Sequence, residues 1–362
     1  MAIKKLNVFI LLGMMLMASC MDDDALWQRE VPGVVSSQGV FIINEGNFMY
    51  NNASLSYFDT ESGNLLNDVF FNTNGLPLGD VATSMTIRDN LGYAVVNNSG
   101  RIYIFDINTF EFTGKITGLT SPRYIHFVSD NKAYVSDLYE SNITIINPQT
   151  HEITGKINVH NPGSPFLQHT SEQMVQYGRY LFVNSWSYDN KVLVIDTYTD
   201  EWIDTIEVAV QPQSMVLDKN NKLWVLSDGG FQGNPYGHEE PGLIRIDAAT
   251  REIEQIFRFN PDDWPRSLAI NGQGDTLWFI NRHVFRHPVG SEAPPERVLE
   301  SSYDSSFSAG YRAIAIDPHS SEIYLADAID HVQPGRVLRF SPSLTPLDTL
   351  KVGIIPGGFC FR

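Results

Sequence analysis

One pattern of residues recurs seven times along the 362-residue chain and limits its fold more than any other feature. Each copy is a short apolar segment, and the central residues of successive copies are roughly 40 to 53 positions apart. These central residues are Met85, Ile125, Met174, Met215, Leu268, Ile314 and Phe359. This spacing is typical of propeller blades, in which each repeat buries its apolar faces only against its neighbours.

Three further strand-like segments follow most copies. In the second copy, SPRYIHF is followed by KAYVSD, NITIIN and ITGKI. Segments rich in Val, Ile and Tyr and bounded by Asn, Gly and Pro are typical of strands. No stretch outside the N-terminal segment has convincing helical periodicity. We therefore expect an all-β chain built of four-stranded blades.

The two ends of the repeat region complement each other. VFIIN, LSYFD and LNDVF form a blade that lacks its first strand, and the terminal IPGGFCF is a first strand that lacks its blade. Joining them closes the ring and removes exposed sheet edges. Two β-sandwiches would explain neither the period nor these ends. We expect a seven-bladed β-propeller over residues 39–362, closed by the C-terminal strand joining the N-terminal blade.

The first residues predict export. Lys4 and Lys5 precede LNVFILLGMMLM, an apolar run too short to span a bilayer as a mature helix. The run MASC, residues 17–20, resembles the lipobox of bacterial lipoproteins, and the three Asp residues at 22–24 resemble the acidic tag of surface lipoproteins of the Bacteroides type. We expect a signal peptide over 1–19, lipidation of Cys20 and a tether over 20–38. The alternative is an ordinary secreted protein cut near Ala18.

Charge and cysteine content limit the partners and the bonds. The formal net charge of -17 argues against nucleic acid or an anionic membrane surface as a partner, since both require Lys and Arg. Contact with the membrane is expected through the lipid anchor only. Cys360 is the one cysteine besides Cys20, so no intrachain disulfide is expected in the mature chain, and its GGFCF context indicates a core residue.

Strand order assigns the long loops to one face of the ring. The longest is SDGGFQGNPYGHEEPG, residues 227–242, and a further loop there is NRHVF; connections on the opposite face are short and polar. Aromatic residues in long loops on a rigid scaffold are typical of binding surfaces. The alternative is that each ring packs under its own loop. The candidate ligand-binding aromatics are Phe48, Tyr50, Tyr139, Trp186, Tyr188, Phe231, Tyr236 and Trp264.

Two sets of polar residues accompany these loops. Each second strand ends in a short polar residue, and the set either surrounds a ligand or caps turns. We retain only Asn184, beside Trp186, as a ligand-binding candidate. At the starts of first strands, Arg123, Arg266 and Arg312 either orient an anionic or amide-bearing ligand or hold loop carbonyls together. The polar set is Asn44, Asn97, Asp137, Asn184, Ser227, Asn281 and Asp327.

The sequence lacks the local motifs of common enzymes. It contains no GxSxG, HExxH, P-loop, EF-hand or CxxC pattern. His238 beside Glu239 is the one tempting acid–base pair, and nothing identifies a nucleophile. We expect binding rather than catalysis, with no metal site and no cofactor, and we include His238 among the ligand-binding candidates.

The repeats resemble known families. KAYVSD and NITIINPQTHEITGKINV are similar to the YVTN/YncE-like propellers, which implies architecture rather than function. FIINEGNF, TSPRYIHF, EQMVQYGRYLFVNSWSY and GIIPGGFCF together resemble the BtuG-type surface lipoproteins. That resemblance implies an outer-membrane protein, facing the cell exterior, that captures cobalamin and passes it to a TonB-dependent transporter of the BtuB type.

Two other classes of function remain open. One is a propeller lyase or hydrolase acting on a carbohydrate or a cyclic peptide, which would require His238 and Glu239 to face a pocket. The other is a structural surface-layer protein, which would leave the aromatic residues buried beneath their loops.

Overall fold

The computed structural model describes residues 35–164, 169–303 and 310–362. These residues form seven four-stranded antiparallel sheets, so the expected all-β seven-bladed propeller is confirmed. The predicted signal peptide, Cys20 and residues 20–34 of the tether lie outside the described residues. In the part that is described, no helix is long and apolar enough to span a bilayer.

Each blade runs from an innermost strand to an outermost one. In six blades the strands follow chain order. They are β4 (Ala82–Arg88), β5 (Leu91–Val96), β6 (Arg101–Asp106) and β7 (Phe112–Ile116); β8 (Pro122–Ser129), β9 (Lys132–Asp137), β10 (Asn142–Asn147) and β11 (Glu152–Asn158); β12 (Ser171–Tyr177), β13 (Tyr180–Ser185), β14 (Lys191–Asp196) and β15 (Glu201–Glu207); β16 (Pro212–Leu217), β17 (Lys222–Ser227), β18 (Gly242–Asp247) and β19 (Ile253–Arg258); β20 (Arg266–Ile270), β21 (Thr276–Asn281), β22 (His283–Pro288) and β23 (Glu296–Leu299); and β24 (Tyr311–Ile316), β25 (Ile323–Asp327), β26 (Pro334–Phe340) and β27 (Pro346–Ile354).

The remaining blade joins the two ends of the repeat region. It combines β28 (Pro356–Phe361) with β1 (Gly39–Asn44), β2 (Ser54–Asp59) and β3 (Leu65–Leu66). The antiparallel register of β28 on β1 runs from Val40 opposite Phe361 to Asn44 opposite Pro356. This is the ring closure that the sequence predicts, made with the strands that it predicts.

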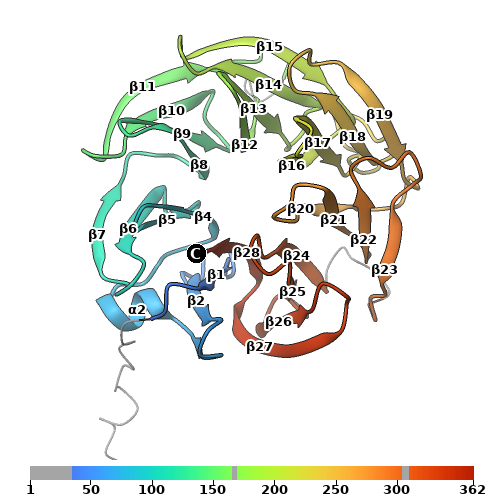
Figure 1. Ribbon diagram of the computed structural model, residues 1–362. Helices are drawn as coiled ribbons and strands as arrows, with labels where there is room; N and C mark the ends of the chain where they lie inside the picture. The colour runs from blue at the N-terminus through green and yellow to red at the C-terminus, as the bar shows by residue number, and fades with distance from the viewer. Residues whose placement is uncertain (1–34, 165–168, 304–309) are drawn as a thin grey trace, which may run out of the picture. The chain divides into compact units, whose positions relative to one another are not determined.

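The seven innermost strands surround the centre of the ring (Figure 1). Each contacts the innermost strand of the next blade, and β28 contacts both β24 and β4, which completes the circle. Because every innermost strand starts at the same end of the ring, the first residues of these strands surround one mouth of the central axis.

Burial differs between the strands of a blade. The middle strands are buried on both faces, as in β5, where Tyr93, Ala94, Val95 and Val96 are all buried, because neighbouring blades cover them on both sides. The outermost strands are largely exposed, as in β7. Apolar clusters lie between blades, and Trp224 is fully buried in one of them.

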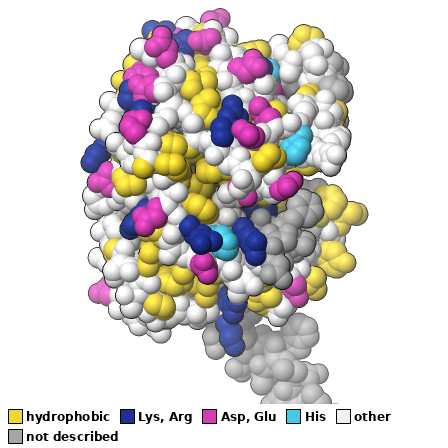
Figure 2. Space-filling model, turned by 90° about the vertical axis from the view of Figure 1, so that its right-hand side faces the viewer, with side chains coloured by type: hydrophobic (Ala, Val, Ile, Leu, Met, Phe, Trp, Pro, Cys, Tyr) yellow, Lys and Arg dark blue, Asp and Glu magenta, His cyan; other side chains and the backbone are white. Residues whose placement is uncertain are grey.

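The outer side of the ring is charged. Over β19, β22 and β23, acidic and basic side chains are interspersed (Figure 2), and Arg286 pairs with Glu296 at 3.0 Å. Exposed pairs of this kind contribute little to stability, about 0–1 kcal/mol each. They keep the outermost strands soluble and discourage pairing with other chains.

Two local expectations were wrong. LNDVF does not form a full outer strand: β3 is only Leu65–Leu66, and the chain then forms the short helix α2 (Val69–Asn74). Phe70 of this helix packs on Tyr103 with ring centroids 5.0 Å apart, so an apolar anchor on the next blade replaces strand pairing. NRHVF is not a long loop, because Arg282 alone, with φ of 60°, joins β21 to β22.

Removal of the closing strand tests the closure. We expect deletion of residues 356–362 to lower the melting midpoint of the chain from residue 21 by more than about 10 °C, since it exposes β1 and removes the contacts of β28 with β4 and β24. Circular dichroism against temperature measures this, and a synthetic peptide of residues 355–362 should restore the midpoint. An unchanged midpoint in the truncated chain would contradict the closure.

Candidate ligand-binding site

A cavity of about 350 Å³ lies at the central axis, and the repeat builds it. The third residue of each of the seven repeated segments lines this cavity, because equivalent positions in the innermost strands face the axis together. These residues are Thr83, Arg123, Gln173, Gln213, Arg266, Arg312 and Gly357. The same lining includes Glu45, Tyr124, Glu172, Trp186, Ser214, Trp264 and Ser267.

Hydrogen bonds between blades hold several of these side chains in place. The side-chain oxygen of Gln173 accepts from the backbone N–H of Met215 at 2.9 Å, and that of Gln213 accepts from the backbone N–H of Ser267 at 2.9 Å. Ser84 Oγ donates to the carbonyl of Arg123 at 2.7 Å. The cavity wall is therefore preorganised by contacts that cross from one innermost strand to the next.

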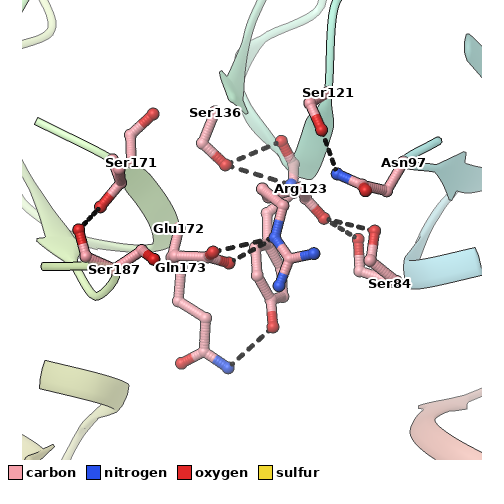
Figure 3. Close-up of polar contacts among 12 residues, drawn as sticks. Ser84, Asn97, Ser121, Arg123, Ser136, Ser171, Glu172, Gln173 and Ser187 are labelled. Carbon is pink, nitrogen blue, oxygen red and sulfur yellow. Dashed lines mark hydrogen bonds and ion pairs between the residues drawn. The ribbon is translucent and has the colours of Figure 1, made fainter. Parts of the chain in front are cut away.

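Two arginine–glutamate pairs lie in the wall. Arg123 Nε donates to both carboxylate oxygens of Glu172, at 2.9 and 2.7 Å (Figure 3). Arg312 donates to Glu45 through Nε and Nη2, each at 3.0 Å. A Cβ on Gly357 would lie 1.9 Å from Glu45 Oε1, so glycine at this position leaves room for the Glu45 carboxylate.

The charges of the wall act on one another. The Glu45 carboxylate raises the pKa of Arg312 above its usual value. Burial, together with the charge of Arg312, lowers the pKa of Arg266 to about 10. Arg266 is only 6 % exposed, so a positive charge is held in a confined, poorly solvated site.

Behind the cavity wall, Asp228 positions Trp186. The indole N–H of Trp186 donates to Asp228 Oδ2 at 2.9 Å, and the backbone N–H of Gly230 donates to Oδ1 at 3.0 Å. Burial nevertheless raises the pKa of Asp228 to about 6. The opening of the long loop at 227–242 thus supports an aromatic side chain of the cavity.

The predicted site residues fall into separate groups. Arg123, Trp186, Trp264 and Arg266 line the cavity together. Tyr188 and Tyr236 form a ring pair with centroids 5.7 Å apart, and the Tyr236 hydroxyl lies 2.8 Å from Ser164 Oγ.

Four other aromatic candidates are solvent-exposed on their loops. Phe48 is 63 %, Tyr50 is 75 %, Tyr139 is 66 % and Phe231 is 40 % exposed. None of the four belongs to the cavity lining. The structural surface-layer alternative requires these side chains to be buried beneath their loops, and they are not. They are available for contact with a large ligand or a partner.

The short polar residues at the ends of the second strands are buried rather than presented to a ligand. Asn184 is fully buried, and its amide donates to the carbonyl of Pro212 at 2.6 Å. Asp137 accepts from the backbone N–H groups of Tyr139 and Glu140, at 2.9 and 3.1 Å. The Asp137 contacts match the turn-capping alternative, whereas the Asn184 amide links its blade to the first strand of the next one.

His238 and Glu239, the acid–base pair considered in the sequence, are held by separate backbone groups. His238 Nε2 donates to the carbonyl of Pro261 at 3.1 Å, and Glu239 Oε1 accepts from the backbone N–H of Val210 at 2.6 Å. Neither side chain lines the central cavity. Within the described ranges, no group of three or more His, Cys, Asp or Glu is arranged to hold a metal ion.

Reasoning from the sequence missed both carboxylates of the cavity. The arginines were recoverable, because they share the third position of the repeat with Gln173 and Gln213. Glu45 and Glu172 lie outside that position, and no spacing in the sequence connects either one to its arginine, 267 and 49 residues away.

The fold and the site define a class: a seven-bladed propeller with a charged, tryptophan-flanked cavity on its axis. The chain belongs to the family described as Domain of unknown function (DUF5074), whose model matches residues 38–335. No curated protein matches the chain.

Solved structures share the fold at low sequence identity. A quinonprotein alcohol dehydrogenase-like protein of Bacteroides thetaiotaomicron is 14 % identical, with a TM-score of 0.66 over 90 % of this chain and 78 % of that one. The periplasmic gluconolactonase of Pseudomonas aeruginosa is 13 % identical, with a TM-score of 0.66 over 90 % and 99 %. Virginiamycin B lyase of Staphylococcus aureus is 14 % identical, with a TM-score of 0.55 over 75 % and 85 %. At this identity, the likeness shows the fold alone.

The raised pKa of Asp228 predicts a pH-dependent stability difference. The folded-state pKa of about 6 exceeds the ordinary 3.8, so the unfolded chain releases this proton at a lower pH than the folded chain does. The free energy of unfolding of the wild type therefore falls as pH rises from about 4 to about 6. We expect Asp228→Asn to gain free energy of unfolding relative to wild type as pH rises from about 4 to about 6, and then to level off. Urea unfolding at several pH values measures the difference.

Asp59→Asn is the matched control. Burial opposes ionisation of Asp59, but hydrogen bonds from Ser62 and Ser36 outweigh it and lower the pKa to about 2. Asp59 is therefore ionised in both the folded and the unfolded chain above about pH 5, and the stability difference for this variant should be nearly flat from there to pH 7. Parallel curves for the two variants would contradict the assignment for Asp228.

Proposed function

We propose that the protein is a lipid-anchored, outward-facing outer-membrane protein that captures a bulky small molecule, cobalamin, and delivers it to a TonB-dependent transporter. The observation that carries the proposal is the joint placement of Trp186 and Trp264 with arginines and glutamines in one preorganised cavity on the axis. The loops of the propeller add exposed aromatic residues, among them Tyr50 and Tyr139.

The chemistry of such a surface suits a large ligand with peripheral amides and a flat aromatic base. Amide side chains and guanidinium groups hydrogen-bond with amides, and indole rings cover flat surfaces. Because Trp186 is held by Asp228 and the glutamines are held by neighbouring backbone groups, little side-chain entropy is lost on binding. The BtuG-like segments and the lipobox-like N-terminus support the same ligand and location, although the N-terminus lies outside the described residues.

The arginine contacts of the two cavity carboxylates favour binding over turnover. Glu45 and Glu172 are each held by hydrogen bonds from an arginine of another blade, so neither carboxylate is free to turn toward a substrate. Burial raises the pKa of Glu172, and the charge of Arg123 opposes that rise. The lyase or hydrolase alternative has support in the fold shared with a lactonase and a lyase. Loss of turnover of a cyclic peptide or lactone in His238→Ala would establish that alternative.

Calorimetric titration tests the proposal directly. For the chain from residue 21, we expect one-to-one binding of cyanocobalamin with sub-micromolar affinity, and at least about tenfold weaker binding in Trp186→Ala and in Tyr236→Ala, because truncating a buried aromatic contact typically costs more than about 1 kcal/mol. The control is Tyr198→Ala, which removes a 78 % exposed tyrosine from the β14–β15 turn.

Absence of heat at several temperatures would remove cobalamin as the ligand. Binding that is equal in wild type, Trp186→Ala and Tyr236→Ala would place the site away from the cavity and its neighbouring loop. Thermal melts of each variant establish that the fold is retained.

A further inference from the structure

Arg123 has hydrogen-bond donors that its ion pair does not use. Both contacts with Glu172 are made by Nε, and the terminal nitrogens Nη1 and Nη2 carry no dashed line in Figure 3 and make no hydrogen bond with any other described residue. The side chain lines the central cavity and is 19 % exposed. A guanidinium presents five N–H donors in a rigid plane, so the two terminal nitrogens can donate to a group that enters the cavity.

Arg312 repeats this arrangement from another blade. It engages Glu45 through Nε and Nη2, and Nη1 makes no hydrogen bond with the described residues. Its side chain is 37 % exposed within the same cavity lining. The cavity is therefore supplied with unused donors from two arginines.

These donors belong to strands that are not neighbours. Arg123 lies on β8 and Arg312 on β24, and two other innermost strands, β28 and β4, separate them around the ring. The charge of Glu45 raises the pKa of Arg312, while burial and, less strongly, the charge of Arg123 lower it. Both side chains line the same cavity.

The donors of the lining suit an anion. Three guanidinium groups and two carboxylates line the cavity, and the charge of Arg266 also interacts with that of Asp228 behind the wall. Both carboxylates are already engaged by Arg123 and Arg312. Carboxylate and phosphate oxygens match the planar donor pattern of arginine better than other common groups.

We propose that the central cavity is a receptor for an oxyanion, a carboxylate or phosphate group, held between the terminal nitrogens of Arg123 and Arg312. The volume of about 350 Å³ accommodates such a group together with a small molecule attached to it. The group has two possible sources. If the group is a small free anion, the inference is independent of the proposed function. If the group is a substituent of the captured ligand, the inference rests on the proposed function.

Equilibrium dialysis of the full-length chain in mild detergent tests the receptor. The probe is radiolabelled inorganic phosphate at constant ionic strength, with succinate as competitor. We expect saturable binding of one phosphate per chain, weakened by succinate. We expect at least about tenfold weaker binding in Arg123→Lys and in Arg312→Lys, since loss of a charge-assisted hydrogen bond has an effect of this size.

The lysine variants test the terminal nitrogens without removing the positive charge that the fold needs beside each glutamate. Lysine preserves a positive charge beside Glu172 or Glu45 but lacks the planar pair of terminal nitrogens. The matched control is Arg339→Lys: Arg339 is 10 % exposed, pairs with Glu322 and Asp348 at 2.6 Å each, and lies outside the cavity lining. No saturable uptake by wild type, or equal affinity in wild type and both cavity variants, would overturn the proposal.

Excess cyanocobalamin separates the two sources. Displacement of phosphate, with weaker cobalamin binding in Arg123→Lys, supports the receptor and assigns the oxyanion to the captured ligand. Phosphate that stays bound beside cobalamin supports a separate small-anion site. Phosphate binding without any cobalamin binding would contradict the proposed function and support the oxyanion receptor. Cobalamin binding without phosphate or succinate binding would contradict the oxyanion receptor alone.

Discussion

The pairing of β28 with β1 is the interaction on which the rest of the structure depends. It joins residues more than 300 positions apart and converts an open row of blades into a ring. Only in a closed ring do seven innermost strands face one axis, and only then do Arg123 and Arg312 act on one cavity. A propeller that opened at this seam would lose the site while the other six blades kept all four of their strands.

The axis of the ring is polar although the spaces between the blades are apolar. Five of the seven innermost strands contribute long arginine or glutamine side chains there, and Arg123 and Arg312 form ion pairs that cross from blade to blade. Buried ion pairs of this kind contribute little net stability, because removing two charges from water offsets their attraction. Their effect is to hold guanidinium groups in defined orientations, which suits recognition.

Much of this could be read from residues alone. The repeated segments around Met85, Ile125 and the other five central residues predicted the blade number, and the complementary ends predicted the closure. The prediction of an outer strand at LNDVF was wrong because a tertiary contact decides the local structure. Phe70 packs on Tyr103 of the next blade, and the chain forms a short helix there. Asn184 stood beside a good candidate, Trp186, yet its side chain turns inward to Pro212.

The sequence by itself determined which residues occupy equivalent positions, because a repeat imposes the same environment on every copy. It therefore placed Thr83, Gln173, Gln213 and the three arginines in one column. Only the tertiary structure decided how those residues are paired. Glu172 and Glu45 approach arginines from other blades, Asp228 turns toward Trp186, and Gly357 leaves space for a carboxylate. Such contacts depend on distances across a closed ring, which no local pattern of residues encodes.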